Sequence, residues 1–221
     1  MASATPSLLT LCRFKLWPAS TNLLEILSAS SVPPALVTAE LFDRGFISPI
    51  AGECNGWTPL MLACFYYAPS ALVSQMLTLS SLDPRARNLA AITDNHGRTC
   101  LHRAACGNSY PESFKLLIRF YPSALLLPST TSRTPLDLAR VAWTTRYKIK
   151  DPGDQRSKIL ELLESATEAF RAGDLRELER LVGAGEGAMG EWKGLVEVCE
   201  AKNIPEVIEE RIIEFIEGLQ R

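Results

Sequence analysis

Histidine is nearly missing from this chain of 221 residues, which has only His96 and His102. Its six cysteines form no C-x-x-C pair and stand at no zinc-type spacing with histidine. No apolar run reaches the roughly 18 residues of a bilayer-spanning helix, and no glycine-rich phosphate loop follows a strand pattern. We therefore expect no metal, no cofactor and no membrane span, with buried free thiols in a reducing compartment.

A strong charge of one sign is also absent, because the whole chain carries a net charge of −2. Its two parts differ, however: residues 1–150 have 14 Lys/Arg against 8 Asp/Glu, and residues 151–221 have 9 against 17. No basic cluster is dense enough to indicate a nucleic-acid surface. This charge asymmetry fits solvated acidic helix faces, an acidic partner bound at one end, or electrostatic attraction between the two parts of the chain.

The first 24 residues contain Arg13 and Lys15, several Ser and Thr, and no acid. This composition loosely fits an organelle transit segment, but a capping segment at the start of the fold is the favoured interpretation. We expect a cytoplasmic or nuclear protein, with organelle import as the alternative.

Three segments of the chain repeat one pattern. They begin at Gly56, Gly97 and Ser132, and they read GWTPLMLAC, GRTCLHRAA and SRTPLDLA. Their threonines are spaced by 41 and then 35 residues. A Thr-Pro pair predicts a helix start, because the threonine oxygen caps free amides and proline needs no donor in the first turn. Apolar residues at helical spacing over 71–77 and 112–118 predict a second helix after each of the first two segments.

These segments resemble the ankyrin signature G-x-T-P-L-H-x-A-A, whose units are about 33 residues long. The resemblance is good over residues 53–140 and plausible over 21–182. It implies an all-α solenoid of helix-turn-helix units, clear at 53–82, 94–125 and 129–164 and degenerate at 21–50 and 165–182.

The flanks of this repeat region depart from the pattern. Residues 1–20 are expected as an N-terminal segment, and 22–28 and 36–45 as the inner and outer helices of a capping unit. Residues 143–156 look like an insertion before a delayed outer helix at 157–164, and 168–182 resembles a degenerate ankyrin unit. A glycine-rich connector at 183–190 precedes amphipathic helices at 191–202 and 205–219, which we expect to cap the stack; a partner-binding helix is the alternative.

No constellation of residues indicates catalysis. By the resemblance, His102 is the structural histidine of the signature, and its replacement by Met61 and Asp137 in the other units predicts weaker local hydrogen bonding. Cys106 lies one helical turn after His102, but nothing in the sequence orients a Cys–His nucleophile pair. An enzyme is therefore not expected.

Protein binding requires less special chemistry than catalysis. The resemblance implies a concave face built from turn tips and inner helices, with the contact residues Trp57, Phe65, Tyr66, Asn95, His96, Arg98 and Arg133. We expect an adaptor or scaffold whose partner carries acidic groups beside an apolar anchor. Two alternatives stay open: Phe65 and Tyr66 pack against the loop 78–93 or the N-terminal cap, and the chain is a permanent subunit of a larger complex.

Overall fold

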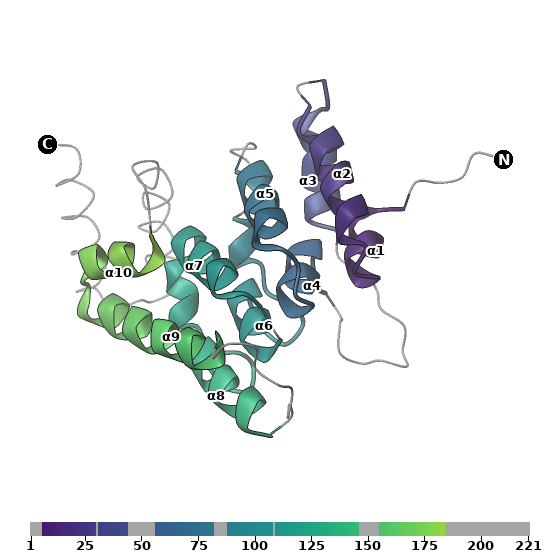
Figure 1. Ribbon diagram of the computed structural model, residues 1–221. Coiled ribbons are helices and arrows are strands. Elements are labelled where there is room, and N and C mark those ends of the chain that lie inside the picture. Colours follow the sequence, from purple (N-terminus) through teal and green to yellow (C-terminus); the bar gives the residue numbers. More distant parts are fainter. Residues whose placement is uncertain are drawn as a thin grey trace, which may run out of the picture.

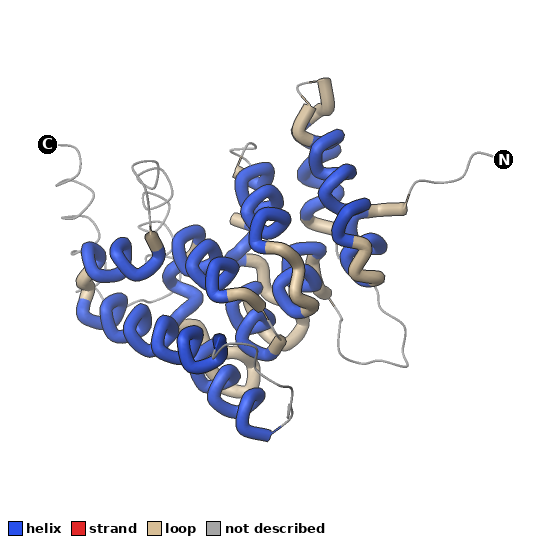
Figure 2. Tube along the Cα trace, in the orientation of Figure 1, coloured by secondary structure: helices blue, strands red, loops and turns tan. Residues whose placement is uncertain are grey.

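The computed structural model describes residues 6–29, 31–43, 56–81, 88–107, 109–145 and 155–183. Within these ranges the chain is all-helical and contains no strand (Figure 2). The elements follow one another as α1 (Leu8–Arg13), α2 (Trp17–Leu27), α3 (Pro34–Leu41), α4 (Pro59–Phe65), α5 (Ser70–Ser80), η1 (Leu89–Ala91), α6 (Cys100–Cys106), α7 (Pro111–Phe120), η2 (Pro122–Leu125), α8 (Pro135–Thr145), α9 (Gln155–Ala172) and α10 (Leu175–Val182).

The helices stack in two rows (Figure 1). In the inner row, α1 contacts α4, α4 contacts α6 and α6 contacts α8. In the outer row, α2 and α3 contact α5, α5 contacts α7 and α7 contacts α10. The apolar core lies between these rows as one continuous cluster from Leu8 to Val182. Each helix pair therefore buries its apolar faces against its neighbours, as expected for a repeat architecture.

Threonine caps start the inner helices of the three repeated segments, as the sequence predicts. Helix α4 begins at Pro59, and the Met61 N–H donates to the Thr58 hydroxyl at 3.3 Å. Thr99 is the N-cap of α6, and the Asp137 N–H of α8 donates to the Thr134 hydroxyl at 3.3 Å. These threonines satisfy amides that the first helical turn leaves without partners.

Small residues bring the inner helices close together. Ala63, Ala104 and Ala139 are fully buried. Gly107 follows α6, and a Cβ placed there would clash with the backbone of Phe65, including its Cα at 2.8 Å. Helices α4 and α6 can therefore approach at this point only because residue 107 lacks a side chain.

The N-terminal unit differs from the expected one. Helix α1 packs on α4 and so holds the inner position that we expected for residues 22–28, while α2 packs on α5 in the outer row. Residues 8–20 are thus part of the stack. Helix α3 lies where the second helix was expected, and it adds a further contact to α1 and α5.

The C-terminal part also differs from the expectation. A single helix, α9, covers both the expected outer helix at 157–164 and the start of the expected unit at 165–182. It contacts α7 and α8, and α10 folds back on both α9 and α7. Asp174 caps α10 by accepting the Glu177 N–H at 3.0 Å, so the Gly-Asp-Leu pattern marks the start of this helix. The helices expected at 191–202 and 205–219 lie outside the described residues.

A short 3₁₀ helix follows each of the outer helices α5 and α7. Leu89 and Ala90 of η1 are buried, and the Asn88 side-chain amide donates to the Phe120 carbonyl at 2.7 Å. In the same way, Ala124 and Leu125 of η2 are buried. The described end of the long connection after α5 is therefore part of the core.

Candidate functional site

Two tight turns form neighbouring tips at the start of the second and third repeated segments. In the tip 94–98, the Asp94 N–H donates to the Arg98 carbonyl at 3.0 Å, and Gly97 has φ 65°. The tip 129–133 contains the same bond, from the Ser129 N–H to the Arg133 carbonyl at 2.9 Å. Both turns thus hold their backbone in place before a partner arrives.

The two tips are also joined to each other. The Thr130 N–H donates to the His96 carbonyl at 3.0 Å, and the His102 Nε2 contacts the Arg133 carbonyl at 3.3 Å. The predicted contact residues are brought together here, with Asn95, His96 and Arg133 exposed and Arg98 half-buried. This edge, residues 95, 96, 98 and 133, is called the tip ridge below.

A buried ion pair supports the tip ridge from beneath. One oxygen of Asp94 accepts the N–H groups of His96 (2.7 Å) and Arg98 (3.0 Å). Its other oxygen pairs with the buried guanidinium of Arg103. A carboxylate that accepts backbone amides and pairs with a guanidinium holds a turn more firmly than a neutral cap does. Sequence reasoning missed both Asp94 and Arg103.

Trp57 lies below this surface rather than on it. Its side chain is only 1 % exposed, with the Arg103 guanidinium carbon 3.9 Å from its ring centroid. The Phe65 ring packs on it edge-to-face at 5.1 Å. The expectation that Trp57 forms part of the contact ridge is therefore corrected, because the ring already has its partners inside the protein.

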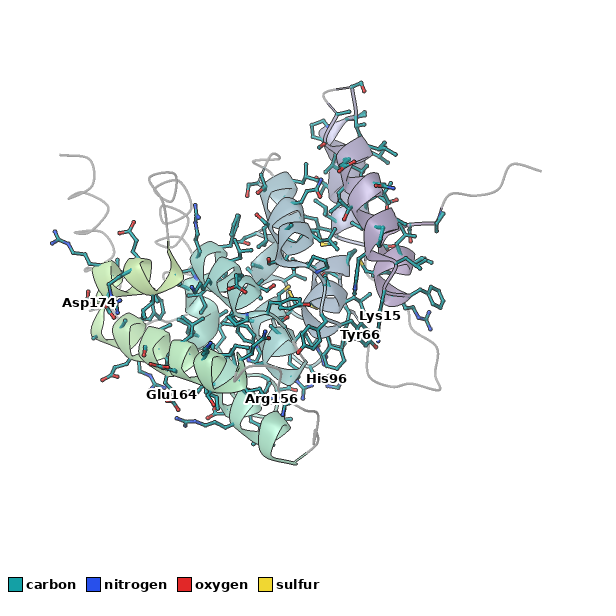
Figure 3. The ribbon with its side chains drawn as sticks, in the orientation of Figure 1. Lys15, Tyr66, His96, Arg156, Glu164 and Asp174 are labelled. Atoms are coloured by element: carbon teal, nitrogen blue, oxygen red, sulfur yellow. The ribbon has the colours of Figure 1, made fainter. Side chains whose placement is uncertain are left out.

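Phe65 and Tyr66 lie at the end of α4 and are half-buried. Their rings meet edge-to-face at 5.0 Å, and the Lys15 Nζ lies 4.6 Å from the Tyr66 ring centroid. Figure 3 shows Lys15 and Tyr66 together on the side of the inner row, with His96 further along the same side. The alternative of packing against the N-terminal unit thus holds in part, while both rings keep some exposed surface.

A second aromatic pair stands beside Tyr66. The rings of Tyr67 and Tyr110 meet edge-to-face at 5.1 Å, and each residue is 36 % exposed. Tyr67 has φ 63°, in the left-handed region that a glycine usually fills after a helix end. A tyrosine held there stores backbone strain of about 1 kcal/mol, which adds Tyr67 to the candidate contact residues.

Several cations near the tips and the N-terminal unit have no acidic partner in the part of the chain that the structure describes. Among the described residues, Arg13, Lys15, Arg98 and Arg133 form no ion pair, whereas Arg140 and Arg180 pair with glutamates elsewhere in the fold. Asp94 and Asp137, the acids nearest the tips and the inner-helix starts, are used as caps. The side chains available to a partner here are therefore cations and aromatic rings.

His102 and Cys106 do not form a nucleophile pair. The Nδ1 of His102 accepts the Thr99 N–H at 3.2 Å, and its Nε2 is engaged by the Arg133 carbonyl. Burial lowers the pKa of His102 to about 4, so the ring is neutral at pH 7. Both ring nitrogens are occupied by structural bonds, which leaves neither for a thiol. Burial also raises the pKa values of Cys12 and Cys100 to about 12, which keeps these thiols protonated.

A sequence comparison decides what kind of repeat this is. The family model described as "Ankyrin repeat" matches residues 96–125, which include His96, Arg98, α6, α7 and η2. The chain contains an ankyrin repeat. No family model of an enzyme matches, and no curated protein matches the chain.

The matched ankyrin repeat contains residues 96–98 of the tip 94–98 together with Arg103, while Asp94 and the tip 129–133 lie outside it. In the described part of the chain, no helix is long and apolar enough to cross a membrane. The same residues hold no group of three or more His, Cys, Asp or Glu side chains that could bind a metal.

One signal in the sequence could have revealed the buried pair. Arg103 stands where the other two repeated segments have Leu62 and Leu138, both of which are buried. A charge at a core position requires a partner, and Asp94 at the preceding tip was the available carboxylate. No comparable signal marked Lys15, because its turn lies outside the repeated segments.

Proposed function

We propose that this chain is a non-catalytic protein-binding module, an adaptor or scaffold, that holds its partner on the concave face of an ankyrin stack. The observation that carries the proposal is the set of cations without ion pairs beside half-exposed aromatic rings along the inner row. The contact residues are Phe65, Tyr66, Asn95, His96, Arg98 and Arg133, with Trp57 as the support beneath them. Aromatic and arginine side chains are the usual anchors of protein interfaces.

The same surface favours a partner segment that carries acidic groups beside an apolar side chain. Arg98 and Arg133 supply the charge at the tip ridge, while Phe65 and Tyr66 supply the apolar contact. Because the two tips are hydrogen-bonded to each other, their backbone loses little conformational entropy when a partner binds. The role is that of a recognition surface, and the supporting residues need no cofactor.

Selection from a displayed peptide library tests the proposal. We expect enriched sequences to combine Asp or Glu with an apolar residue, and their affinity to fall at least about tenfold, or 1.4 kcal/mol, on Arg98→Glu plus Arg133→Glu. Arg176→Glu is the matched control, since Arg176 is exposed on α10. Equal affinity of the double variant and the control contradicts the proposed face.

A permanent subunit of a larger complex is the second candidate, favoured by the exposed apolar residues Phe14 (64 %), Ile26 and Leu36 at the N-terminal end of the stack. The native mass in a cell extract separates the two roles. A permanent subunit never elutes as a free 24.3 kDa chain, whereas an adaptor does so in part.

A further inference from the structure

An open groove of about 340 Å³ lies on the outer row of the stack. Ala71 and Ser74 line it from α5, and Lys115 and Leu116 line it from α7. Gly183, directly after α10, completes the lining. The groove belongs to the outer helices, so it is distinct from the tip ridge and from the aromatic rings of the inner row.

The chain leaves the described fold at this groove. Gly183 ends α10 with φ 64°, and its N–H donates to the Glu179 carbonyl. A Cβ placed on Gly183 would meet no atom within 4 Å, so the surface around it is open. The 38 residues of the sequence that follow, 184–221, therefore begin at the groove wall.

The side chains that line the groove favour an occupant that is both apolar and acidic. Lys115 and the acid Glu112 both line the groove from α7. Lys115 is in none of the ion pairs of the described residues. Leu116 is half-buried next to Lys115, so an apolar side chain placed over it would bury further surface.

Residues 205–219 have this chemistry. They read PEVIEERIIEFIEGL, with five glutamates against one arginine. Their apolar residues recur every three or four positions, at Val207, Ile208, Ile212, Phe215, Ile216 and Leu219. The 21 residues between Gly183 and Pro205 can span up to about 70 Å when extended, so the groove lies well within their reach.

We propose that residues 205–219 dock in the α5–α7 groove of the same chain. Their apolar side covers Leu116 and Ala71, and a glutamate lies beside Lys115. This is recognition of an amphipathic segment by a groove, and the covalent connection gives it a millimolar effective concentration. The docked segment covers the outer row and leaves the tip ridge free, so this inference does not depend on the proposed function.

Hydrogen exchange in the full-length chain tests the docking. We expect amides in 205–219 to exchange about tenfold faster in Lys115→Glu plus Leu116→Asp than in the wild type. Unchanged protection of α4 and α6 shows that the stack of the variant is intact. Lys158→Glu is the control, because Lys158 is exposed on α9. Equal exchange of 205–219 in all three proteins overturns the proposal.

A charge swap and a cross-link identify the occupant. Adding Glu210→Lys and Glu214→Lys to Lys115→Glu restores protection if these charges meet in the groove. Carbodiimide couples Lys115 to a nearby glutamate, and we apply it to a mixture of isotopically light and heavy chains. If the segment docks within its own chain, Lys115 couples to a glutamate of 206–217, and each cross-linked peptide pair is either all light or all heavy. Mixed-isotope products indicate a second copy, and coupling to Glu191, Glu197 or Glu200 indicates the preceding segment; either result overturns the proposal.

Discussion

The third position of the inner helix carries a different residue in each repeated segment. His102 closes a capping box with Thr99 and also reaches the neighbouring tip. Asp137 accepts the Thr134 N–H (3.0 Å) and hydroxyl (2.7 Å), which keeps the pKa of its carboxyl low. The expectation of weaker bonding is therefore wrong for Asp137, because a carboxylate makes the same cap. What Asp137 does not reproduce is the second nitrogen, which in His102 joins α6 to the tip 129–133.

His102 makes the stability of the fold sensitive to acid. Its pKa falls from 6.5 to about 4 on burial, so between these values the unfolded chain binds a proton that the folded chain does not. The free energy of unfolding is thus highest above pH 6.5 and declines as the pH falls toward 4, by roughly 3 kcal/mol from this residue. Urea unfolding at several pH values measures this decline, and His102→Gln flattens it. An equally steep decline in the variant would contradict the assignment.

The buried pair at residues 94 and 103 predicts a large single-residue effect. Asp94→Ala leaves the Arg103 guanidinium buried without its carboxylate and removes the acceptor of two tip amides. We expect a loss of about 3–5 kcal/mol in the free energy of unfolding, measured by urea denaturation at pH 7. Glu177→Ala, which breaks the exposed pair with Arg180, is the control. A loss no larger than that of the control would contradict the supporting role of Asp94.

The repeat pattern predicted the positions of residues better than the solvent exposure of their side chains. The pattern placed Trp57 at a contact position, but it could not show that a charged side chain from the next unit would lie against the ring. Arg103 does so because its own position faces the core and its charge is neutralised by Asp94. The exposed residues of the same ridge, Asn95, His96 and Arg133, follow directly from the tips to which they belong.

Helices with a threonine cap were predictable from the sequence, and so were the outer helices α5 and α7, which contain the predicted ranges 71–77 and 112–118. The helices at the two ends of the stack were the ones displaced. Helices α4, α6 and α8 begin where Thr58, Thr99 and Thr134 predict. Helix α1 has no Thr-Pro start and is only six residues long, so periodicity alone placed the inner helix too late. Helix α9 continues through Ser165 and Ala166 because no glycine or proline interrupts residues 155–172.

The contact between α4 and α6 predicts a steric effect at the helix end. Gly107→Ala places a methyl group against the backbone of Phe65, which cannot move as a side-chain end would. We expect a loss of about 1–3 kcal/mol, the usual range for overpacking, measured as a lower thermal midpoint. Thr78→Ala on the exposed side of α5 is the control. An unchanged midpoint for Gly107→Ala would show that the two helices can separate there.

Among the described residues, charge differs between the faces of the stack. In these ranges Arg13, Lys15, Arg98 and Arg133 form no ion pair, whereas Arg140 on α8 and Arg180 on α10 are paired with glutamates. Lys115 is a further described cation without an ion pair, and it lies in the groove of the outer row. The sequence revealed the difference between the two parts of the chain but not these faces, because faces arise only when the helices stack. The division leaves the inner row attractive to acidic partners over a distance of about 10 Å at moderate salt.

The continuous core predicts that the described stack unfolds as a unit. Buried residues connect α1 to α10 without a break, and short repeat arrays with strong interfaces between neighbours unfold cooperatively. We expect far-ultraviolet circular dichroism and tryptophan fluorescence to give the same urea midpoint. Separate midpoints would show that the N-terminal helices, which include Trp17, unfold independently of the helices beside Trp57.

The bond from the Thr130 N–H to the His96 carbonyl has a consequence for how this surface can change over generations. It uses backbone atoms alone, so the side chains at residues 95, 96, 130 and 133 can be exchanged without loss of the link. An insertion or deletion in either tip, by contrast, breaks the register between the two turns and moves both. Point substitutions can therefore change which partners this face binds, whereas a change of length in one tip disturbs both tips.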